Sequence, residues 1–217
     1  MTQPPDSTSP SETTRQALIA AATALFGQKG FAATSTREIA AASGANIAAI
    51  AYHFGGKEGL RQACVLTFAE RMAKVLATAP DPPDLTPNLA RNLMQMIARN
   101  MLTQLLGDPQ TQLSVAFVLR EIAEDGAGAQ VLYDNLVGPA HRRICGLMAA
   151  ASGQSVEDPA LQLRVFTLIG QALYFRVGGP IVRRRMGWQM IGPAEITQIT
   201  EVVLANIDAM ILVQKVL

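Results

Sequence analysis

The side chains between Ser35 and Lys57 have the types and the spacing that recognition of double-stranded DNA would need. An asparagine amide at position 46 can pair bidentately with adenine, and the methyl groups of Ala48 and Ala49 can contact the methyl group of thymine. The cationic side chain of Lys57 can add its charge to the free amides at the start of a helix, which favours a phosphate there. These residues could therefore serve a groove-reading surface.

The surrounding sequence predicts two short helices that would position these side chains. Ser35 and Glu38 have the spacing of a capping box at the start of one helix. Gly44 ends that helix, and Asn46 is a favourable cap for a second helix over residues 47–53. This pattern alone favours a DNA-binding helix-turn-helix and an ordinary helical hairpin in a bundle core about equally.

Residues able to support catalysis or metal binding are sparse in the sequence. The sequence has no nucleophile elbow, phosphate-binding loop or paired-carboxylate motif. The two histidines, His53 and His141, are far apart along the chain, and the sequence clusters no set of metal ligands. Cys64 and Cys145 both fall in apolar helical patterns that predict buried free thiols. We therefore predict no enzymatic activity, no cofactor and no metal.

The segment from about residue 12 to residue 60 resembles the DNA-binding domain of TetR-type transcriptional repressors. The core of the resemblance is carried by Ser35, Arg37, Ile39, Ala40, Gly44, Ile50, His53, Phe54, Lys57 and Leu60. Upstream positions that also match are Leu18, Ala22, Leu25, Phe26, Gly30 and Phe31. The chain departs from the family pattern at Ala45-Asn46, at Ala48 and at Ala51, where most relatives carry a tyrosine that touches the DNA backbone.

The resemblance implies a DNA-binding surface, a twofold dimer and a ligand-binding domain. The residues expected to contact DNA are Ser35, Thr36, Arg37, Asn46, Ile47, Ala48, Ala49, Tyr52, His53 and Lys57. Because one short reading helix covers few base pairs, we expect a homodimer on a near-palindromic operator. For Arg37 the alternative is a solvated side chain. For Tyr52 and His53 it is that one packs in the core while the other faces DNA.

Composition and charge describe a helical protein with an aliphatic core. The 217 residues are 49% hydrophobic but only 5% aromatic, and the net charge is +1. Residues 12–75 carry seven Lys or Arg and four Glu, so a few placed cations would have to supply the affinity for phosphates. The first twelve residues have no signal-peptide pattern, and arginines, glycines and a proline interrupt the longest apolar region. We expect a cytoplasmic protein with no membrane span.

The periodicity of apolar residues predicts an all-α chain with no strand and no internal repeat. The predicted helices cover about residues 10–28, 36–42, 47–53, 57–79, 87–106, 110–124, 129–151, 158–175 and 193–210, with a further turn or short helix at 181–185. Pro139 is expected to bend or split the helix over 129–151. The predicted organisation is a disordered arm (1–9), a helix-turn-helix domain (10–60) and a C-terminal ligand-binding and dimerisation domain (61–217), joined by the long helix from residue 57.

From about residue 88 onward the chain also resembles the C-terminal domain of CecR-like members of the TetR family, most closely over residues 170–176. Polar residues on its apolar helices could line an effector pocket, or form a buried Arg–Glu network, or lie exposed at helix ends. The predicted effector-binding set is Met96, Asn100, Arg120, Tyr133, Gln171 and Tyr174. The predicted dimer-interface set is Leu161, Val165, Leu168, Ile196, Ile199, Val203 and Ile207.

These observations together predict a DNA-binding transcriptional regulator, most simply a repressor that an unknown small-molecule effector releases from its operator. The alternative is a helical protein-interaction or scaffold module that does not bind DNA. The helix-turn-helix resemblance favours the first prediction over the second.

Overall fold

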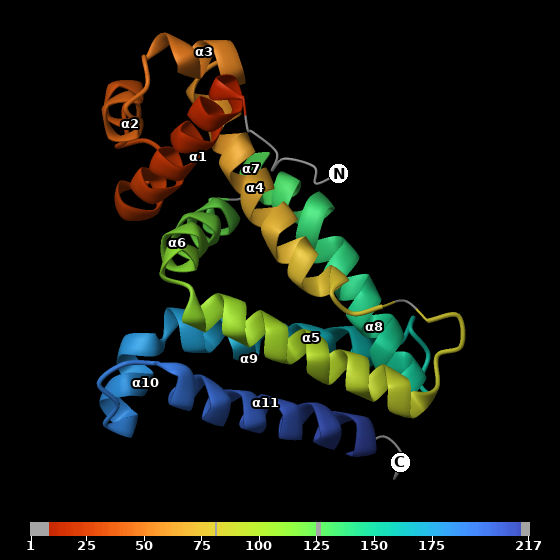
Figure 1. Ribbon diagram of the computed structural model, residues 1–217. Helices are drawn as coiled ribbons and strands as arrows, with labels where there is room; N and C mark the ends of the chain where they lie inside the picture. Colours follow the sequence, from red (N-terminus) through yellow and green to blue (C-terminus); the bar gives the residue numbers. More distant parts are fainter. Residues whose placement is uncertain (1–8, 81, 125–126, 214–217) are drawn as a thin grey trace, which may run out of the picture. The chain divides into compact units, whose positions relative to one another are not determined.

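The computed structural model describes residues 9–80, 82–124 and 127–213, and these residues form helices and connecting loops without a β-strand (Figure 1). This confirms the predicted all-α fold. The helices are α1 (Pro10–Lys29), α2 (Thr36–Ser43), α3 (Ala48–Phe54), α4 (Lys57–Ala77), α5 (Pro87–Gly107), α6 (Pro109–Ala123), α7 (Ala127–Leu132), the π-helical turn η1 (Tyr133–Val137), α8 (Gly138–Ser152), α9 (Pro159–Val177), α10 (Gly179–Met186) and α11 (Pro193–Val213).

Three helices begin where a small polar residue precedes a proline. The side chains of Ser9, Thr86 and Asp158 accept backbone N–H groups at the starts of α1, α5 and α9, over 3.2, 3.3 and 2.9 Å. The proline that follows each cap has no N–H to leave unsatisfied in the first turn. The sequence therefore sets these three helix starts locally.

The predicted helix over 129–151 is divided into α7, η1 and α8. Pro139 has no N–H to donate to the carbonyl four residues earlier, and its ring crowds that carbonyl. The chain widens into a single π-helical turn, Tyr133–Val137, before α8 begins at Gly138. Pro139 thus splits this region, as expected.

The chain forms two compact units, and neither is continuous in sequence. The first contains the chain up to Phe68 together with Leu113–Leu132, and the second contains Ala69–Gln112 and the chain from Tyr133 onward. Both α4 and α6 contribute residues to both units. The predicted boundary after residue 60 assumed contiguous domains, whereas the first unit also takes in most of α6 and all of α7.

Aromatic contacts organise the core of the first unit. Phe26 of α1 is fully buried, and its ring lies 5.4 Å from that of Phe31 and 5.5 Å from that of Phe117 on α6. Ile39 and Ile50, from α2 and α3, complete the core between the short helices. The long-range contact from Phe117 explains why part of α6 belongs to this unit.

The second unit is a helical bundle in which α5 packs against α8, α9 and α11. Its core contains Leu102, Met148 and Leu161, all fully buried. Arg143 of α8 donates NH1 to the carbonyl oxygen of Leu76 at 2.7 Å and NH2 to that of Ala79. This guanidinium donates to carbonyls at and just beyond the C-terminal end of α4, where the helix leaves carbonyls without an intrahelical donor.

Candidate nucleic-acid interface

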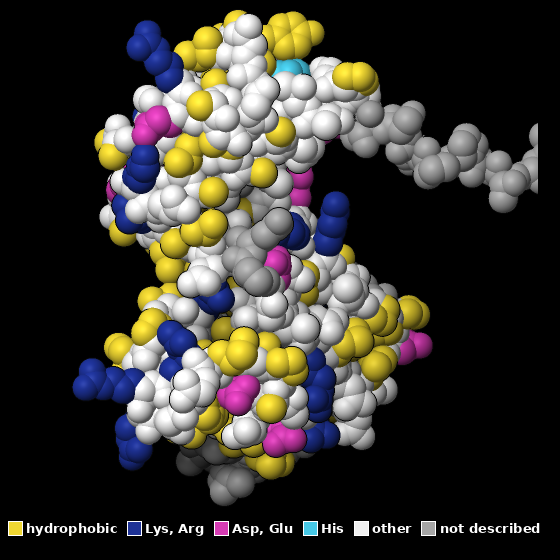
Figure 2. Space-filling view, turned by 60° about the vertical axis from the view of Figure 1, so that its left-hand side comes forward, with side chains coloured by type: hydrophobic (Ala, Val, Ile, Leu, Met, Phe, Trp, Pro, Cys, Tyr) yellow, Lys and Arg dark blue, Asp and Glu magenta, His cyan; other side chains and the backbone are white. Residues whose placement is uncertain are grey.

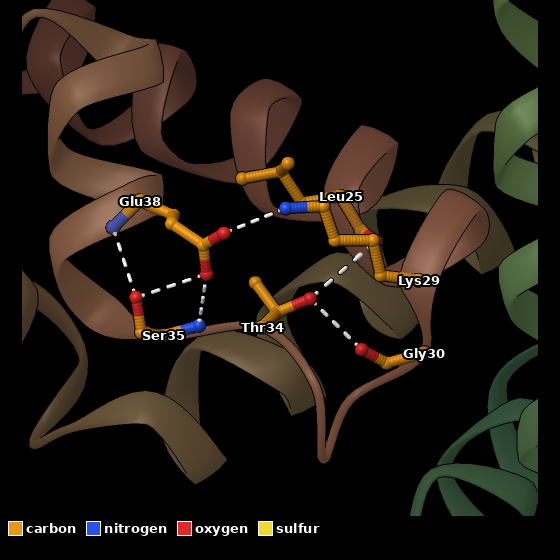
Figure 3. Close-up of polar contacts among 6 residues, drawn as sticks. All are labelled: Leu25, Lys29, Gly30, Thr34, Ser35 and Glu38. Carbon is orange, nitrogen blue, oxygen red and sulfur yellow. Dashed lines mark hydrogen bonds and ion pairs between the residues drawn. The ribbon is translucent and has the colours of Figure 1, made fainter.

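A reciprocal hydrogen-bonded cap starts α2 and ties it to the end of α1 (Figure 3). The N–H of Glu38 donates to Ser35 Oγ at 3.2 Å, and the N–H of Ser35 donates to Glu38 Oε2 at 2.8 Å. Lys29 Nζ donates to the other carboxylate oxygen of Glu38 at 2.6 Å. The buried Thr34 hydroxyl donates to the carbonyl oxygen of Gly30 at 2.8 Å. The predicted capping box is present, and it fixes the turn between α1 and α2.

The same cluster keeps the Glu38 carboxylate ionised. The hydrogen bond from Lys29, followed by those from the Ser35 backbone and hydroxyl, lowers the pKa of Glu38 from 4.5 to about 2. A negative charge at this position also interacts favourably with the positive end of the α2 dipole. The start of α2 is therefore electrostatically stabilised at neutral pH.

The turn between α2 and α3 depends on a left-handed glycine and an asparagine cap. Gly44 ends α2 with φ of 67°, a conformation that residues with a Cβ adopt only at a cost. Asn46 Oδ1 then accepts the N–H of Ala48 at 2.9 Å at the start of α3. Bidentate pairing with adenine needs both the oxygen and the NH₂ group of the amide, so an Asn46 that reads a base as predicted either accepts a second hydrogen bond at Oδ1 or releases the Ala48 N–H.

One face of α3 is buried and the opposite face is open to solvent. Ile50 points into the core, whereas Ile47, Ala48 and Ala51 are exposed and Tyr52 is 82% exposed. Residues four apart on a helix share a face, so 47 and 51, and 48 and 52, line one continuous exposed strip. A strip of small and apolar side chains with a tyrosine at one end can approach the floor and the edge of a DNA groove.

Three consecutive aromatic rings end α3. The rings of Tyr52 and His53 meet edge to face at 4.9 Å, and those of His53 and Phe54 lie 5.9 Å apart. The Arg15 guanidinium from α1 lies 5.6 Å from the centroid of Phe54. His53 and Phe54 are half-buried, so Tyr52 is the member of this group that solvent, or DNA, reaches most freely.

Lys57 is engaged within the unit. Its Nζ donates to the carbonyl oxygen of Phe31 at 2.6 Å and lies 4.2 Å from the centroid of that ring. The Arg61 guanidinium lies 4.4 Å from the same ring. Lys57 therefore holds the loop after α1 against the start of α4, and only its remaining N–H donors are available for the predicted phosphate contact.

Arg37, by contrast, is an exposed cation. Among the described residues it forms no ion pair or side-chain hydrogen bond. Figure 2 shows Lys and Arg side chains dispersed over the face in view, without a broad basic patch. Individually placed cations such as Arg37 would therefore have to supply the phosphate affinity.

The structure brings the ten predicted DNA-contacting residues together along α2, α3 and the start of α4, within the first unit. Their environments differ. Ser35 and Asn46 act as helix caps, Lys57 anchors a loop, and Thr36, Ala49 and His53 are half-buried. The freely exposed members are Arg37, Ile47, Ala48 and Tyr52.

Sequence reasoning overlooked the role of Gly59 in placing α3 on α4. A Cβ at this residue would lie 1.9 Å from the carbonyl oxygen of Phe54 and 3.0 Å from its carbonyl carbon. No side chain fits there unless the backbone moves. A glycine so soon after Gly55-Gly56 was a signal that the chain makes a close approach here.

Sequence reasoning also overlooked the partner of Glu121. Arg61 Nε of α4 lies 2.9 and 2.8 Å from the two carboxylate oxygens of Glu121 on α6. Arg61 Nη2 donates to the carboxylate of Glu124 at 2.9 Å. A Cβ at Gly128 of α7 would lie 1.9 Å from Glu121 Oε2. A buried Arg–Glu network was one predicted alternative, but Arg61 precedes Glu121 by too many residues for local pattern to pair them.

The six predicted effector-binding residues do not form one pocket. Arg120 belongs to the first unit, whereas Met96, Asn100, Tyr133, Gln171 and Tyr174 belong to the second. Gln171 and Tyr174 line a shallow hollow between α9 and α11, where Gln171 Oε1 accepts Asn206 Nδ2 at 2.9 Å. A separate apolar cavity of about 40 Å³ lies between α5, α8, α9 and α11 and includes none of the six.

The predicted dimer-interface residues need revision. Ile196 is half-buried. The other six are buried inside the single chain and form part of its core: Leu161, Val165, Leu168, Ile199, Val203 and Ile207. A partner cannot reach side chains that their own chain covers. The exposed large apolar residues of the same two helices are instead Leu163, Phe166, Tyr174 and Val177 on α9, and Val202 and Leu212 on α11.

Within the described part of the chain, no group of three or more His, Cys, Asp or Glu could hold a metal ion. No single described helix is long and apolar enough to cross a membrane. The pair α9 and α10, bent by 75°, passes the same test of length and composition only when taken together.

Two families match separate parts of the chain. Residues 18–64 match the bacterial regulatory proteins of the tetR family, and residues 90–212 match the C-terminal domain of the HTH-type transcriptional dual regulator CecR. The first match covers α2, α3 and the capped turn described above. The second covers most of the helical bundle.

Individual proteins match over most of their length. The HTH-type transcriptional dual regulator CecR of Shigella flexneri is 35% identical over 207 residues, which is 91% of each chain. A transcriptional regulator from Pseudomonas aeruginosa PAO1 has a similar structure, with a TM-score of 0.68, 21% identity and 90% of each chain covered. The multidrug binding protein EbrR, solved with malachite green, gives a TM-score of 0.60 at 24% identity, over 89% of this chain and 96% of EbrR.

Proposed function

Because the chain belongs to the TetR family of bacterial transcriptional regulators, with a C-terminal domain of the CecR type, we propose that it is a homodimeric repressor released from its operator by a small molecule. The family consists of DNA-binding regulators and not of enzymes. The further elements of the proposal are repression, the dimer and the effector.

The observation that carries the proposal is the exposed strip on α3. Ile47, Ala48 and Tyr52 are open to solvent although the helix is short and its other face is buried. A bundle helix would instead cover its apolar residues. Glycine turns and the capped start of α2 hold this strip in place, which supports a role as the groove-reading helix.

In this proposal, contacts divide between the groove floor and the DNA backbone. Ala48 and Ile47 present methyl groups suited to thymine, and Arg37 and the Tyr52 hydroxyl are suited to phosphates. Asn46 Oδ1 accepts the N–H of Ala48, so its NH₂ group and the second lone pair of Oδ1 are what it offers to a base while this bond is kept. Ala51, where most relatives carry a tyrosine, leaves Tyr52 as the principal aromatic contact.

The proposed dimer uses the exposed apolar residues of α9 and α11. Leu163 is 66% exposed and Val202 is 56% exposed in the single chain. Apolar area of this kind gains roughly 25 cal/mol per Å² when a partner covers it. A second copy is the natural partner, because a single short reading helix is too small for useful specificity and twofold symmetry doubles the site.

The proposed effector binds the helical bundle of the second unit and changes the conformation of the chain. A ligand can release DNA only if it binds a conformation that DNA does not favour, with a typical coupling of about 1–3 kcal/mol. The apolar cavity between α5, α8, α9 and α11 is far below the roughly 300–1,000 Å³ of ordinary ligand pockets. An effector there would have to move these helices apart. The complex of EbrR with malachite green supports ligand binding in this fold.

The deciding experiment is DNA binding by the full chain to the region upstream of its own gene. Fluorescence anisotropy should show salt-sensitive binding to one near-palindromic fragment, with random duplex of the same length bound at least a hundredfold more weakly. A transcription assay on that fragment then distinguishes repression from activation. Equal affinity for both duplexes would reject the proposal in favour of a helical interaction module.

A further inference from the structure

A pocket of about 340 Å³ lies in the second unit where α9 turns into α10. Its apolar wall includes Leu106 from the end of α5, Phe175 from α9 and Ile191 from the loop before α11. This volume falls at the lower end of the range of pockets that hold small molecules. The pocket is distinct from the 40 Å³ apolar cavity and contains none of the predicted effector residues.

Arg176 supplies one unsatisfied cation to this pocket. The Nη2 atom of its guanidinium is buried and has no hydrogen-bond partner among the described residues. Burial lowers the pKa of Arg176, and the charge of Asp108 raises it in part. The Asp108 carboxylate also accepts Thr111 Oγ1 at 2.7 Å and Gln104 Nε2 at 3.3 Å. A guanidinium in this state would be stabilised by an anion that completes its hydrogen bonds.

Arg183 of α10 supplies a second cation to the same pocket. Its NH1 donates to the carbonyl oxygen of Gln189 at 3.1 Å, which orients the guanidinium and leaves its other donors available. The sequence from Pro159 to Ala194 contains five arginines and no acidic residue. No carboxylate of this segment neutralises the pair, and the acidic residue whose charge acts on Arg176 is Asp108, which follows α5.

We propose that this pocket binds a small organic carboxylate, with the carboxylate between Arg176 and Arg183 and the apolar body against Leu106, Phe175 and Ile191. A guanidinium fork matches the two oxygens of a carboxylate. An inorganic anion would leave the apolar wall exposed to water. A neutral ligand would leave the buried Nη2 atom of Arg176 without a charged hydrogen-bond acceptor. This inference rests on the proposed function and deepens it, because it names the chemical class of the effector.

The chain carries its own reporter for the test. Trp188, the only tryptophan in the sequence, lies in the loop that also supplies Met190 and Ile191 to the pocket. The full-length protein is titrated with octanoate below its micelle concentration, by tryptophan fluorescence and by calorimetry. Octanamide, equal in size and uncharged, and inorganic phosphate are titrated in parallel. We expect saturable binding of octanoate, with both controls at least about tenfold weaker.

Variants then place the ligand. Arg176→Met and Arg183→Met should each weaken octanoate binding at least about tenfold, whereas Arg184→Met, on the same helix but exposed and outside the pocket, should not. Arg176→Lys, which keeps the charge, should recover part of the loss. Circular dichroism checks folding, and Arg183→Met remains an independent test if Arg176→Met unfolds.

Octanoate binding no tighter than octanamide binding, or equal affinities for Arg176→Met, Arg183→Met and Arg184→Met, would overturn the inference. All of these titrations are done without DNA. A chain that binds octanoate but no operator would refute the proposed function and support the pocket. A chain that binds its operator but not octanoate would refute the pocket and leave the proposed function standing.

Discussion

Arg61 of α4 and Glu121 of α6 form a nearly dry ion pair, in which one guanidinium nitrogen faces both oxygens of a carboxylate that is 2% exposed. The same guanidinium also reaches Glu124, whose side chain is 55% exposed. One arginine therefore has a buried partner on α6 and a solvated partner in the turn that follows this helix, which permits a controlled comparison.

Glu121→Gln should lower the free energy of unfolding by about 1.5–3 kcal/mol, because it removes a charged hydrogen-bond acceptor from a buried guanidinium. Glu124→Gln, the matched control, should cost less than about 1 kcal/mol, because solvent already screens that pair. Urea denaturation followed by circular dichroism measures both. Equal losses for the two variants would show that burial does not distinguish the pairs.

Gly59→Ala should lower the stability of the first unit by about 1–3 kcal/mol and weaken operator binding, because the new methyl group meets the Phe54 carbonyl and displaces α3. Gly146→Ala in α8 is the control, since a Cβ at this residue would meet no neighbouring atom within 4 Å. That change should be neutral or stabilise by up to about 1 kcal/mol. Thermal melts and anisotropy report the two effects. An unaffected Gly59→Ala protein would contradict the geometry.

Stability should fall in acid through Glu38. Its pKa is about 2 in the folded chain, against a usual value of 4.5, so the folded state binds fewer protons than the unfolded state across this interval. The contribution of Glu38 is therefore complete above pH 4.5 and is lost as the pH falls from 4.5 towards 2.

Glu38→Gln should lack this component of the acid dependence, and Lys29→Met should raise the pKa of Glu38, because the Lys29 hydrogen bond is the largest cause of the shift. NMR titration of the Glu38 carboxylate gives the pKa directly. An ordinary pKa in the unmodified protein would contradict the contact between Lys29 and Glu38.

Arg37→Met should weaken binding to operator and random duplex alike and reduce the slope of log affinity against log salt by about 1, because one phosphate contact is lost. Lys74→Met, which removes an exposed charge of the same sign outside the helix-turn-helix, should leave the slope unchanged. Anisotropy over a range of salt concentrations makes the measurement. An unchanged slope for Arg37→Met would leave Arg37 as a solvated side chain.

Leu163→Glu and Val202→Glu should convert the dimer to monomer with little change in the stability of the chain, because both side chains are already exposed. Leu85→Glu, an exposed leucine outside α9 and α11, should leave the dimer intact. Sedimentation equilibrium at micromolar concentration reports the mass. A monomeric unmodified chain, or dimers that survive both substitutions, would remove α9 and α11 from the proposed interface.

Local signals in the sequence were sufficient for most of the helices and for the turn between α2 and α3. The capping box of Ser35 and Glu38, the end of α2 at Gly44 and the break at Pro139 each follow from residues within a few positions of one another. Such features depend on short-range hydrogen bonding and sterics, which the sequence displays directly.

Features that depend on which elements meet could not be predicted in the same way. An apolar stripe on a helix shows that one face is covered, but not whether its own chain or a second copy covers it. For this reason the pattern predicts a place at the dimer interface for Ile199 and Val203, whereas both lie in the core of the single chain. The pairing of Glu121 likewise depends on the position of Arg61. The lack of space for a side chain at Gly59 depends on the position of the Phe54 carbonyl group.

The contact between Phe26 and Phe117 affects the order in which the protein is built. During synthesis α1, α2 and α3 leave the ribosome well before the segment of α6 that covers Phe26. Until Phe117 emerges, an aromatic surface of the nascent chain stays uncovered. The contact then closes across the whole length of chain between the two residues, which carries an entropic cost. The first unit therefore reaches its final packing only after Ala69–Gln112 of the second unit has been translated.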